Sequence, residues 1–234
     1  MQFIPLVIGV ILLVAYLTKR TANVKLPFVL LKSVLSVCFI AFGAFSGALN
    51  VNLPMLSTAL FVCGGVCGLL GDVYLDFKYL YKEHTDTYLY SGFISFAVCH
   101  VFYTFAMLTM YDAGLPNFLF AIFGGFVVFA AVPVTEKMGL FYGKFKVIAA
   151  IYSFILGFTT GLSFTFIISE GADFQRVALH VALMFFLLSD ALLSNIYFSR
   201  KEKDRTNRVL IVLNHLFYYI AQFLIMFTLN FYRG

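Results

Sequence analysis

Long apolar runs alternate with short polar connections along the chain, and this pattern predicts helices that cross a membrane. A spanning helix needs about 20 mostly apolar residues. Eight segments fit this description: residues 3–18, 28–49, 54–77, 88–111, 115–134, 145–169, 177–198 and 208–231. The first lacks a basic leader and is followed at once by Lys19 and Arg20, so we expect a retained helix. The connections are short, so we expect one transmembrane helical domain over residues 1–234, with its function inside the bundle.

The composition agrees with a lipid environment. The chain is 62% hydrophobic and 12% charged, whereas soluble domains contain about 25% charged residues. Its 14 Tyr and absence of Trp predict that Tyr forms the aromatic belt at the membrane interface. The net charge of +5 is spread over the connections, so we do not expect nucleic-acid binding. All four cysteines lie within apolar segments, which predicts small buried side chains and neither a disulfide framework nor a zinc cluster.

The distribution of basic residues predicts the orientation in the membrane. All but three of the 16 Lys and Arg residues lie in or beside the first, third, fifth and seventh connections. The exceptions are Lys32, Arg176 and Arg233. Because basic connections stay in the cytoplasm, we expect both termini on the non-cytoplasmic side of a plasma (inner) membrane.

Carboxylates interrupt two of the apolar runs. Asp72 stands in the stretch "CGLLGDVYLDF", residues 67–77, and Asp190 in "FFLLSDALLSN", residues 185–195. An ionised carboxylate in hydrocarbon costs several kcal/mol unless it is paired or hydrated, so such residues indicate a functional site. Asp76 follows Asp72 by one turn, and two roles remain open for it: supporting that site, or a solvated position at the helix end.

Other polar side chains share the depth of these carboxylates. Counting about 1.5 Å per residue from the basic ends of the helices, they fall in the cytoplasmic half or near the midplane. This set comprises Lys32, His100, Tyr152 and Asn214. The outer half of the apolar runs is almost empty of polar groups. The pattern predicts a cavity that opens toward the cytoplasm or the inner leaflet.

The chain contains an internal repeat. The stretch "LLGDVYL" at 69–75 matches "LLSDALL" at 187–193, an offset of 118. "HVFYTFA" at 100–106 matches "HLFYYIA" at 215–221, an offset of 115. In the preceding helices, Lys32, Gly43 and Gly47 match Lys146, Gly157 and Gly161, each at an offset of 114. These matches predict an all-α membrane protein in which helices 2–4 and 6–8 form a parallel repeat, and the glycines predict close helix packing.

Several short motifs together resemble the YhhN family of membrane lysoplasmalogenases. They are Gly71–Asp72, Phe96–His100–Tyr103, Ser189–Asp190, and Tyr219 with Ala221, Gln222, Leu224 and Ile225. Lys32 and Tyr152 also fall where the family carries a Lys and a Tyr. The resemblance covers nearly the whole chain. It implies hydrolysis of the vinyl-ether bond of a lysophospholipid, the lysoplasmalogen, to a fatty aldehyde and glycerophosphoethanolamine or glycerophosphocholine.

The chemistry of that reaction suits two carboxylates. Protonation of a vinyl ether gives an oxocarbenium ion, and two carboxylates with different proton affinities supply the acid and the negative charge beside the cation, as in glycosidases. We therefore expect Asp72 and Asp190 to form an acid/base pair that needs no metal or cofactor. The substrate-binding candidates are Lys32, His100, Tyr103, Tyr152, Asn214, Tyr219 and Gln222.

Lys32 has two alternative roles, and two other functions compete with hydrolysis of a vinyl ether. We expect Lys32 to bind the substrate phosphate at the mouth of the cavity; alternatively, it is the counter-ion of an Asp. The rival functions are a lipid or proton-coupled transporter and a zinc amidase of ceramidase type, with His100, His215 and an Asp as ligands. The expected partners are the lysophospholipid and the bilayer, and the sequence carries no signal for an oligomeric partner.

Overall fold

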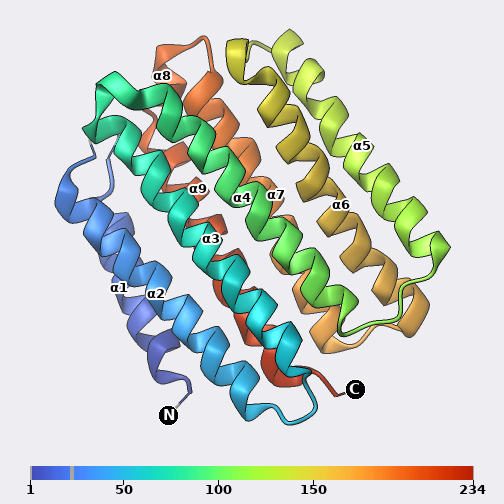
Figure 1. The fold of residues 1–234 in the computed structure, drawn as a ribbon. Helices are drawn as coiled ribbons and strands as arrows, with labels where there is room; N and C mark the ends of the chain where they lie inside the picture. Colours follow the sequence, from blue (N-terminus) through green and yellow to red (C-terminus); the bar gives the residue numbers. More distant parts are fainter. Residues whose placement is uncertain (1, 22–23, 234) are drawn as a thin grey trace.

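The structure is a computed structural model that describes residues 2–21 and 24–233, and its secondary structure is helical (Figure 1). The helices are α1 (Ile4–Lys19), α2 (Leu26–Leu49), α3 (Met55–Leu80), α4 (Thr85–Leu108), α5 (Leu115–Lys137), α6 (Lys146–Glu170), α7 (Phe174–Phe198), α8 (Glu202–Arg205) and α9 (Arg208–Thr228). Short 3₁₀ turns precede α4 and α6 and follow α9.

Seven of the described helices are long and apolar enough to cross a membrane: α2 to α7 and α9. The protein is therefore a multi-pass membrane protein. The first expected span corresponds to α1, whose 16 residues give a length of about 24 Å. This is shorter than the hydrocarbon core of a typical bilayer, which is about 30 Å thick. Helix α8 has four residues and lies in the connection between α7 and α9.

Local sequence sets several helix ends. The Asn207 side chain accepts hydrogen bonds from the Val209 and Leu210 amides and caps the start of α9. Asp173 accepts one from the Arg176 amide at the start of α7. Gly171, with φ of 92°, ends α6 in a conformation that residues with a Cβ rarely adopt.

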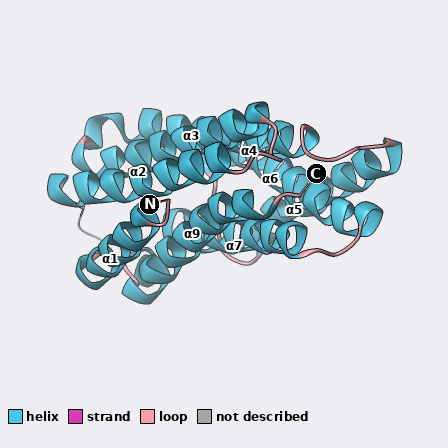
Figure 2. Cartoon of the chain, turned by 90° about the horizontal axis from the view of Figure 1, so that it is seen from below, coloured by secondary structure: helices cyan, strands magenta, loops and turns pink. Residues whose placement is uncertain are grey.

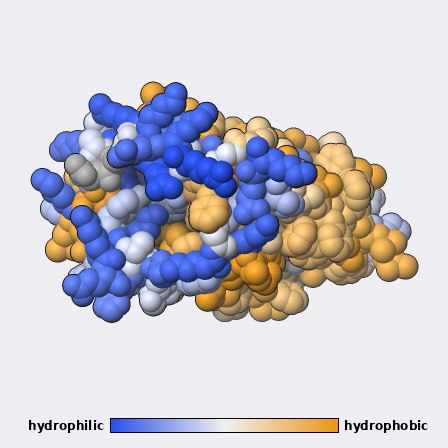
Figure 3. All heavy atoms as spheres, turned by 90° about the horizontal axis from the view of Figure 1, so that it is seen from above, coloured by the Kyte–Doolittle hydropathy of each residue, from blue (hydrophilic) through white to orange (hydrophobic). Residues whose placement is uncertain are grey.

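The helices run alternately up and down, and both termini lie at the same end of the bundle (Figure 1). The other end carries the α1–α2, α3–α4, α5–α6 and α7–α9 connections, and we call it the basic end because most Lys and Arg residues lie there. Seen from above this end, hydrophilic residues form a broad patch beside an apolar flank (Figure 3). Viewed from the opposite end, α2, α3 and α4 form one layer, and α1, α9 and α7 form a second (Figure 2).

The predicted parallel repeat is confirmed by the helix pairs that pack together. Helix α3 packs on α4 as α7 packs on α9, and α2 packs on α3 as α6 packs on α7. The contacts between the two halves also form an equivalent pair: α4 packs on α6, and α9 packs on α2. Helices α3 and α7, which carry Asp72 and Asp190, therefore occupy equivalent places in the two halves.

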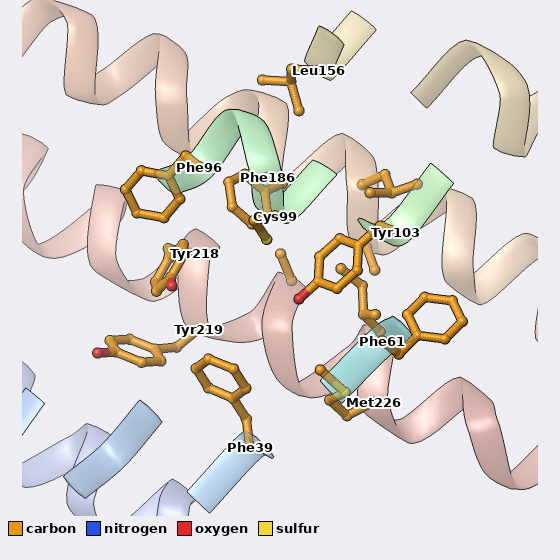
Figure 4. Packing of buried hydrophobic residues seen from close by; sticks show 14 of the residues in the cluster. Phe39, Phe61, Phe96, Cys99, Tyr103, Leu156, Phe186, Tyr218, Tyr219 and Met226 are labelled. Atoms are coloured by element: carbon orange, nitrogen blue, oxygen red, sulfur yellow. The ribbon is translucent and has the colours of Figure 1, made fainter. Parts of the chain in front are cut away.

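Aromatic side chains fill the core between the two halves (Figure 4). Phe96 of α4, Phe186 of α7 and Tyr218 of α9 pack edge to face, with ring centroids 5.3–6.1 Å apart. Gly71 allows Phe96 to approach α3, since a Cβ there would lie 2.7 Å from the Phe96 ring. This aromatic cluster therefore joins α4, α7 and α9.

Candidate functional site

Asp72 projects from α3 into a buried set of donors on α2. Lys32 Nζ lies 3.0 Å from Asp72 Oδ1, and Ser36 donates a hydrogen bond of 3.2 Å to Oδ2. Asp72 and Lys32 are 4% and 5% exposed. A buried carboxylate needs such partners to remain ionised. Asp72 is therefore a carboxylate with a cation in direct contact.

Asp76 extends this ion pair into a cluster. Its Oδ1 lies 3.2 Å from Arg20 Nη2 at the end of α1, and its Oδ2 lies 3.6 Å from Lys32 Nζ. Asp76 is 1% exposed, so it is not a solvated helix end. Two roles were left open for Asp76, and the structure supports the role of supporting the site, because Asp76 shares Lys32 with Asp72.

Asp190 has a different environment, although it occupies the equivalent place in the repeat. Tyr152 of α6 donates a hydrogen bond to Asp190 Oδ2. In the described part of the chain, no Lys, Arg or His nitrogen lies within 4.0 Å of this carboxyl group. Lys146, the repeat equivalent of Lys32, instead pairs with Glu136, at 2.6 Å, and its side chain is half exposed. The two halves thus share a backbone arrangement and differ in charge.

A small cavity brings the two carboxylates together, and we call it the central cavity. Its volume is about 20 Å³, enough for roughly one water molecule. It is lined by Lys32, Asp72, Leu75, Phe96, Ser189, Asp190, Leu193, Tyr197, Asn214, His215 and Tyr218. The pairing of α7 with α9 is tied here by reciprocal hydrogen bonds: Asn214 Nδ2 donates to the Ser189 carbonyl, and Ser189 Oγ donates to the Asn214 carbonyl.

A larger apolar cavity adjoins it, and we call this one the lateral cavity. It has a volume of about 170 Å³ and lies between α4, α5, α6 and α7. Its lining includes Phe93, Val128, Leu156 and Leu187. It extends to Leu140 and Tyr142 in the α5–α6 connection, at the basic end. Three residues line both cavities: Asp190, Leu193 and Tyr197. Asp190 is therefore exposed to an apolar space on one side and to the Asp72 site on the other.

The remaining polar candidates form a network behind the central cavity. Tyr219 donates to the Lys32 carbonyl at 3.3 Å and lies 3.3 Å from Ser36 Oγ. Deeper in the bundle, Tyr103 donates to Gln222 at 2.6 Å, and Gln222 donates to Tyr218 at 3.2 Å. Tyr103, Tyr219 and Gln222 do not line the central or lateral cavity, and they reach the site through other side chains.

The two histidines of the repeat are not equivalent in the structure. His215 lines the central cavity, and its Nδ1 lies 2.7 Å from the Ile211 carbonyl. His100 packs edge to face on Phe186, with centroids 4.5 Å apart, and neither ring nitrogen has a hydrogen-bond partner among the described residues. Within residues 2–21 and 24–233, no three His, Cys, Asp or Glu side chains gather in a metal-binding arrangement. The zinc amidase alternative thus lacks a ligand set in this region.

The position of Lys32 differs from our expectation. We placed its ammonium at the mouth of the cavity, but its side chain is buried and bound to Asp72 and Asp76. A lysine can reach the interface only if its stem extends along an open path, and here two carboxylates hold it inside. The alternative role, counter-ion of a carboxylate, agrees with the structure.

Arg20, Ser36 and Tyr218 contact or line the site but were not among the sequence candidates. Arg20 lies just beyond an expected helix and was used only as an orientation signal, and Ser36 is a common small residue in an apolar run. Tyr218 lines the central cavity, and a signal for it was present: it is the repeat equivalent of Tyr103, whereas our list contained its neighbour, Tyr219.

The chain was compared with curated proteins, with solved structures and with models of protein families. No curated protein and no solved structure matches the chain. The model of the YhhN family matches residues 27–229, a stretch that contains all but the first residue of α2, α3 to α9 and every residue of the central cavity. This helical membrane protein, with a carboxylate from each half of its repeat at one cavity, belongs to the YhhN family.

Proposed function

We propose that this protein is a lysoplasmalogenase-like hydrolase that cleaves the vinyl-ether bond of a lysophospholipid. The observation that carries the proposal is the unequal pair of carboxylates at one cavity: Asp72 has a cation partner and Asp190 has a phenol. Membership of a family that includes lysoplasmalogenases supports the same reaction.

The unequal partners suggest a role for each carboxyl group. A carboxyl group that is removed from water without a cation holds its proton more readily than one beside an ammonium ion. We assign Asp190 as the acid and Asp72 as the group that remains negatively charged. Asp190 also borders the lateral cavity, which suits the hydrocarbon chain of the substrate.

The reaction can be completed with these groups and one water molecule. Asp190 transfers its proton to the β-carbon of the vinyl ether, which leaves an oxocarbenium ion beside the negative charge of Asp72. Water adds to the cation and returns a proton to Asp190. Asp190 then gives this proton to the glycerol oxygen and takes one from the hemiacetal hydroxyl. The hemiacetal breaks into a fatty aldehyde and the glycerophospho-headgroup, and both carboxyl groups regain their starting states.

The test is hydrolysis by the purified protein in detergent, with aldehyde measured by mass spectrometry on a panel of lysolipids. Alkenyl lysophospholipids should yield aldehyde, and their acyl and saturated-ether analogues should not. Because no membrane gradient exists in detergent, turnover under these conditions separates an enzyme from a transporter. Absence of aldehyde from every alkenyl lipid, with folded protein, would reject the proposal.

Replacement of either carboxylate tests the mechanism. We expect Asp72→Asn and Asp190→Asn each to lower kcat by at least about 10²-fold, the lower range for general acid–base catalysis. The matched control is Asp86→Asn, since Asp86 pairs with Lys144 on the surface and is half exposed. A variant that kept more than about half of the wild-type rate would remove that carboxylate from the mechanism.

A further inference from the structure

A third buried cation lies near the site and has no carboxylate partner. Lys78, close to the end of α3, is 9% exposed. Its Nζ lies over the Tyr197 ring, 2.8 Å from the centroid, and 4.8 Å from the centroid of Tyr79. Among the described residues no carboxylate oxygen lies within 4.0 Å of it. Buried lysines are normally paired, so this one calls for a ligand.

Arg20 offers unused donors beside the same aromatic rings. Its Nη2 binds Asp76, but Nε and Nη1 are buried and have no hydrogen-bond partner among the described residues. Arg20 is 4% exposed. It lines a small space of about 10 Å³, which we call the basic cavity, with Tyr79, Leu193, Ile196, Tyr197, Ile211, Asn214 and His215. A guanidinium with free N–H groups is a strong donor to phosphate oxygens.

The buried charges do not balance. Three buried cations, Arg20, Lys32 and Lys78, lie around two buried carboxylates, Asp72 and Asp76. Asp190 lies more than 4.0 Å from all three cations, and in the proposed function it carries its proton. If all three are ionised, one positive charge is left over in a place where an unpaired charge is costly. A ligand with one negative charge would neutralise it.

Shared residues connect the three cavities. The lateral and central cavities share Asp190, and the central and basic cavities share Asn214 and His215. Leu193 and Tyr197 border all three. The lateral, central and basic cavities follow one another in the order of the parts of an alkenyl lysophospholipid: a hydrocarbon chain, the vinyl ether, and a phosphodiester beyond the glycerol.

We propose that the phosphodiester of the substrate headgroup binds at the basic cavity, which must widen to admit it, between Arg20 in the cavity wall and Lys78 on the Tyr197 ring. This inference rests on the proposed function and replaces Lys32 by Lys78 as the phosphate ligand. It limits the substrates to lipids with a phosphodiester close to the ether bond, and it disfavours alkenylglycerols that lack a phosphate. Phosphate bound there would hold the vinyl ether beside Asp72 and Asp190.

The test uses binding, so that it does not depend on turnover. The probes are a saturated alkyl lysophospholipid, which has no vinyl ether to cleave, and the alkylglycerol without phosphate. Affinities are measured by native mass spectrometry of the detergent-purified protein. Wild-type protein should bind the phosphate-bearing probe at least about 10-fold more tightly, the effect of one hydrogen bond to a charged group.

Variants assign the effect to the site. Lys78→Met should reduce the preference about 10-fold, and Lys78→Arg should retain most of it because the charge is kept. Lys82→Met is the matched control, since Lys82 is an exposed lysine just beyond the same helix. Lys82→Met should leave the preference unchanged. If Lys78→Met is unstable, Arg20→Lys provides the test. A weaker preference for the phosphate-bearing probe in Arg20→Lys would support binding of the phosphate by the guanidinium group, and an unchanged preference would show that any positive charge at this position suffices and would contradict it.

Two outcomes would overturn the inference. Equal affinity of wild-type protein for the two probes would remove the phosphate site, whether or not the protein hydrolyses vinyl ethers. Inorganic phosphate or glycerophosphoethanolamine that binds as tightly as the alkyl lysophospholipid would show a site for soluble anions and reject the lipid headgroup as its source. Conversely, a clear preference for the lipid phosphate in a protein that releases no aldehyde would reject the hydrolase proposal and leave the binding site in place.

Discussion

Asp72 and Asp190 differ in the groups that contact them, even though they occupy equivalent positions in the repeat. Asp72 contacts an ammonium and a hydroxyl, at 3.0 and 3.2 Å. Asp190 contacts the Tyr152 phenol and borders an apolar cavity. Since the charged form of a carboxyl group is stabilised by a cation and disfavoured by removal from water, neighbours decide which group can act as the acid. Our residue-scale predictions therefore concern Lys32 and Tyr152.

Lys32→Met removes the cation shared by Asp72 and Asp76. We expect kcat for the alkenyl lysophospholipid to fall at least about 10-fold, with KM changed less than about twofold, because the lysine supports a reacting group and does not hold the substrate. The same substitution at the repeat position, Lys146→Met, should change neither constant, since Lys146 pairs with Glu136 at the surface.

Loss of a buried ion-pair partner also destabilises proteins, by about 3–5 kcal/mol. The Lys32→Arg variant, which keeps the charge, is therefore tested beside Lys32→Met, and the melting temperature of both variants in detergent is measured to separate unfolding from loss of catalysis. A several-fold rise in KM at unchanged kcat in a folded Lys32→Met protein would contradict the counter-ion role and restore the phosphate role.

Tyr152→Phe removes the hydrogen bond that Tyr152 donates to the Asp190 carboxyl group. We expect kcat to fall about 10-fold, the effect of one hydrogen bond to a group that becomes charged during the reaction. Tyr142→Phe is the control, because Tyr142 also lines the lateral cavity but its hydroxyl lies near Thr135, at 3.1 Å. Steady-state kinetics on the two variants measure the difference, and equal rates for them would separate Tyr152 from the reaction.

Among the helix pairs, α5 and α6 make an unusually close contact along their glycines. A Cβ at Gly157 would lie 2.6 Å from the Gly124 carbonyl oxygen, and one at Gly125 would lie 2.7 Å from the Phe154 ring. Small residues permit such close contact between membrane helices. Because α5 and α6 also form walls of the lateral cavity, their separation would change its shape.

Gly157→Ala should separate α5 from α6 and lower the melting temperature in detergent by about 3–10 °C, since overpacking costs about 1–3 kcal/mol. The obstacle is backbone, which cannot rotate away as a side chain can. The control is Gly114→Ala, where the nearest atom would lie 3.5 Å from the new Cβ. Melting curves of the two variants should differ, and an unchanged midpoint for Gly157→Ala would contradict the close packing of these helices.

For the molecule as a whole, the two halves of the repeat share a pattern of helix packing and differ in chemistry. The cation cluster belongs to the first half together with α1, whereas the apolar cavity lies against the second half. The central cavity receives one carboxylate from each half. In the proposed function the acid and its charged partner come from different halves, so that a nearly symmetric bundle would provide an asymmetric site.

The orientation of the bundle remains a prediction of its charge distribution, which places the basic end in the cytoplasm. Asn52→Cys lies in the α2–α3 connection and Lys203→Cys in α8, at opposite ends of the bundle, and both positions are exposed. An impermeant thiol reagent applied to intact cells should label the first variant and spare the second. Labelling of Lys203→Cys alone would reverse the orientation.

The sequence by itself determined the class of protein, most of the spans and the repeat. Hydrophobic runs predict helices because the bilayer core has no water to satisfy exposed backbone groups, so each run must form its own hydrogen bonds. The same reasoning identified Asp72 and Asp190, since an ionisable residue in hydrocarbon stands out in any apolar run. Eight spans were expected, and the first of them corresponds to α1, which is shorter than a spanning helix needs to be.

The tertiary structure alone decided what each polar residue contacts. Lys32 and Lys146 match in the repeat, yet one is buried between two carboxylates and the other is at the surface, because α2 begins six residues before Lys32 and α6 begins at Lys146 itself. Arg20 and Asp76 are 56 residues apart in sequence and form an ion pair. Partners on different helices depend on crossing positions and side-chain direction, which helical periodicity does not encode. The cation partner of Asp72, and the other buried cations near it, therefore follow only from the packed bundle.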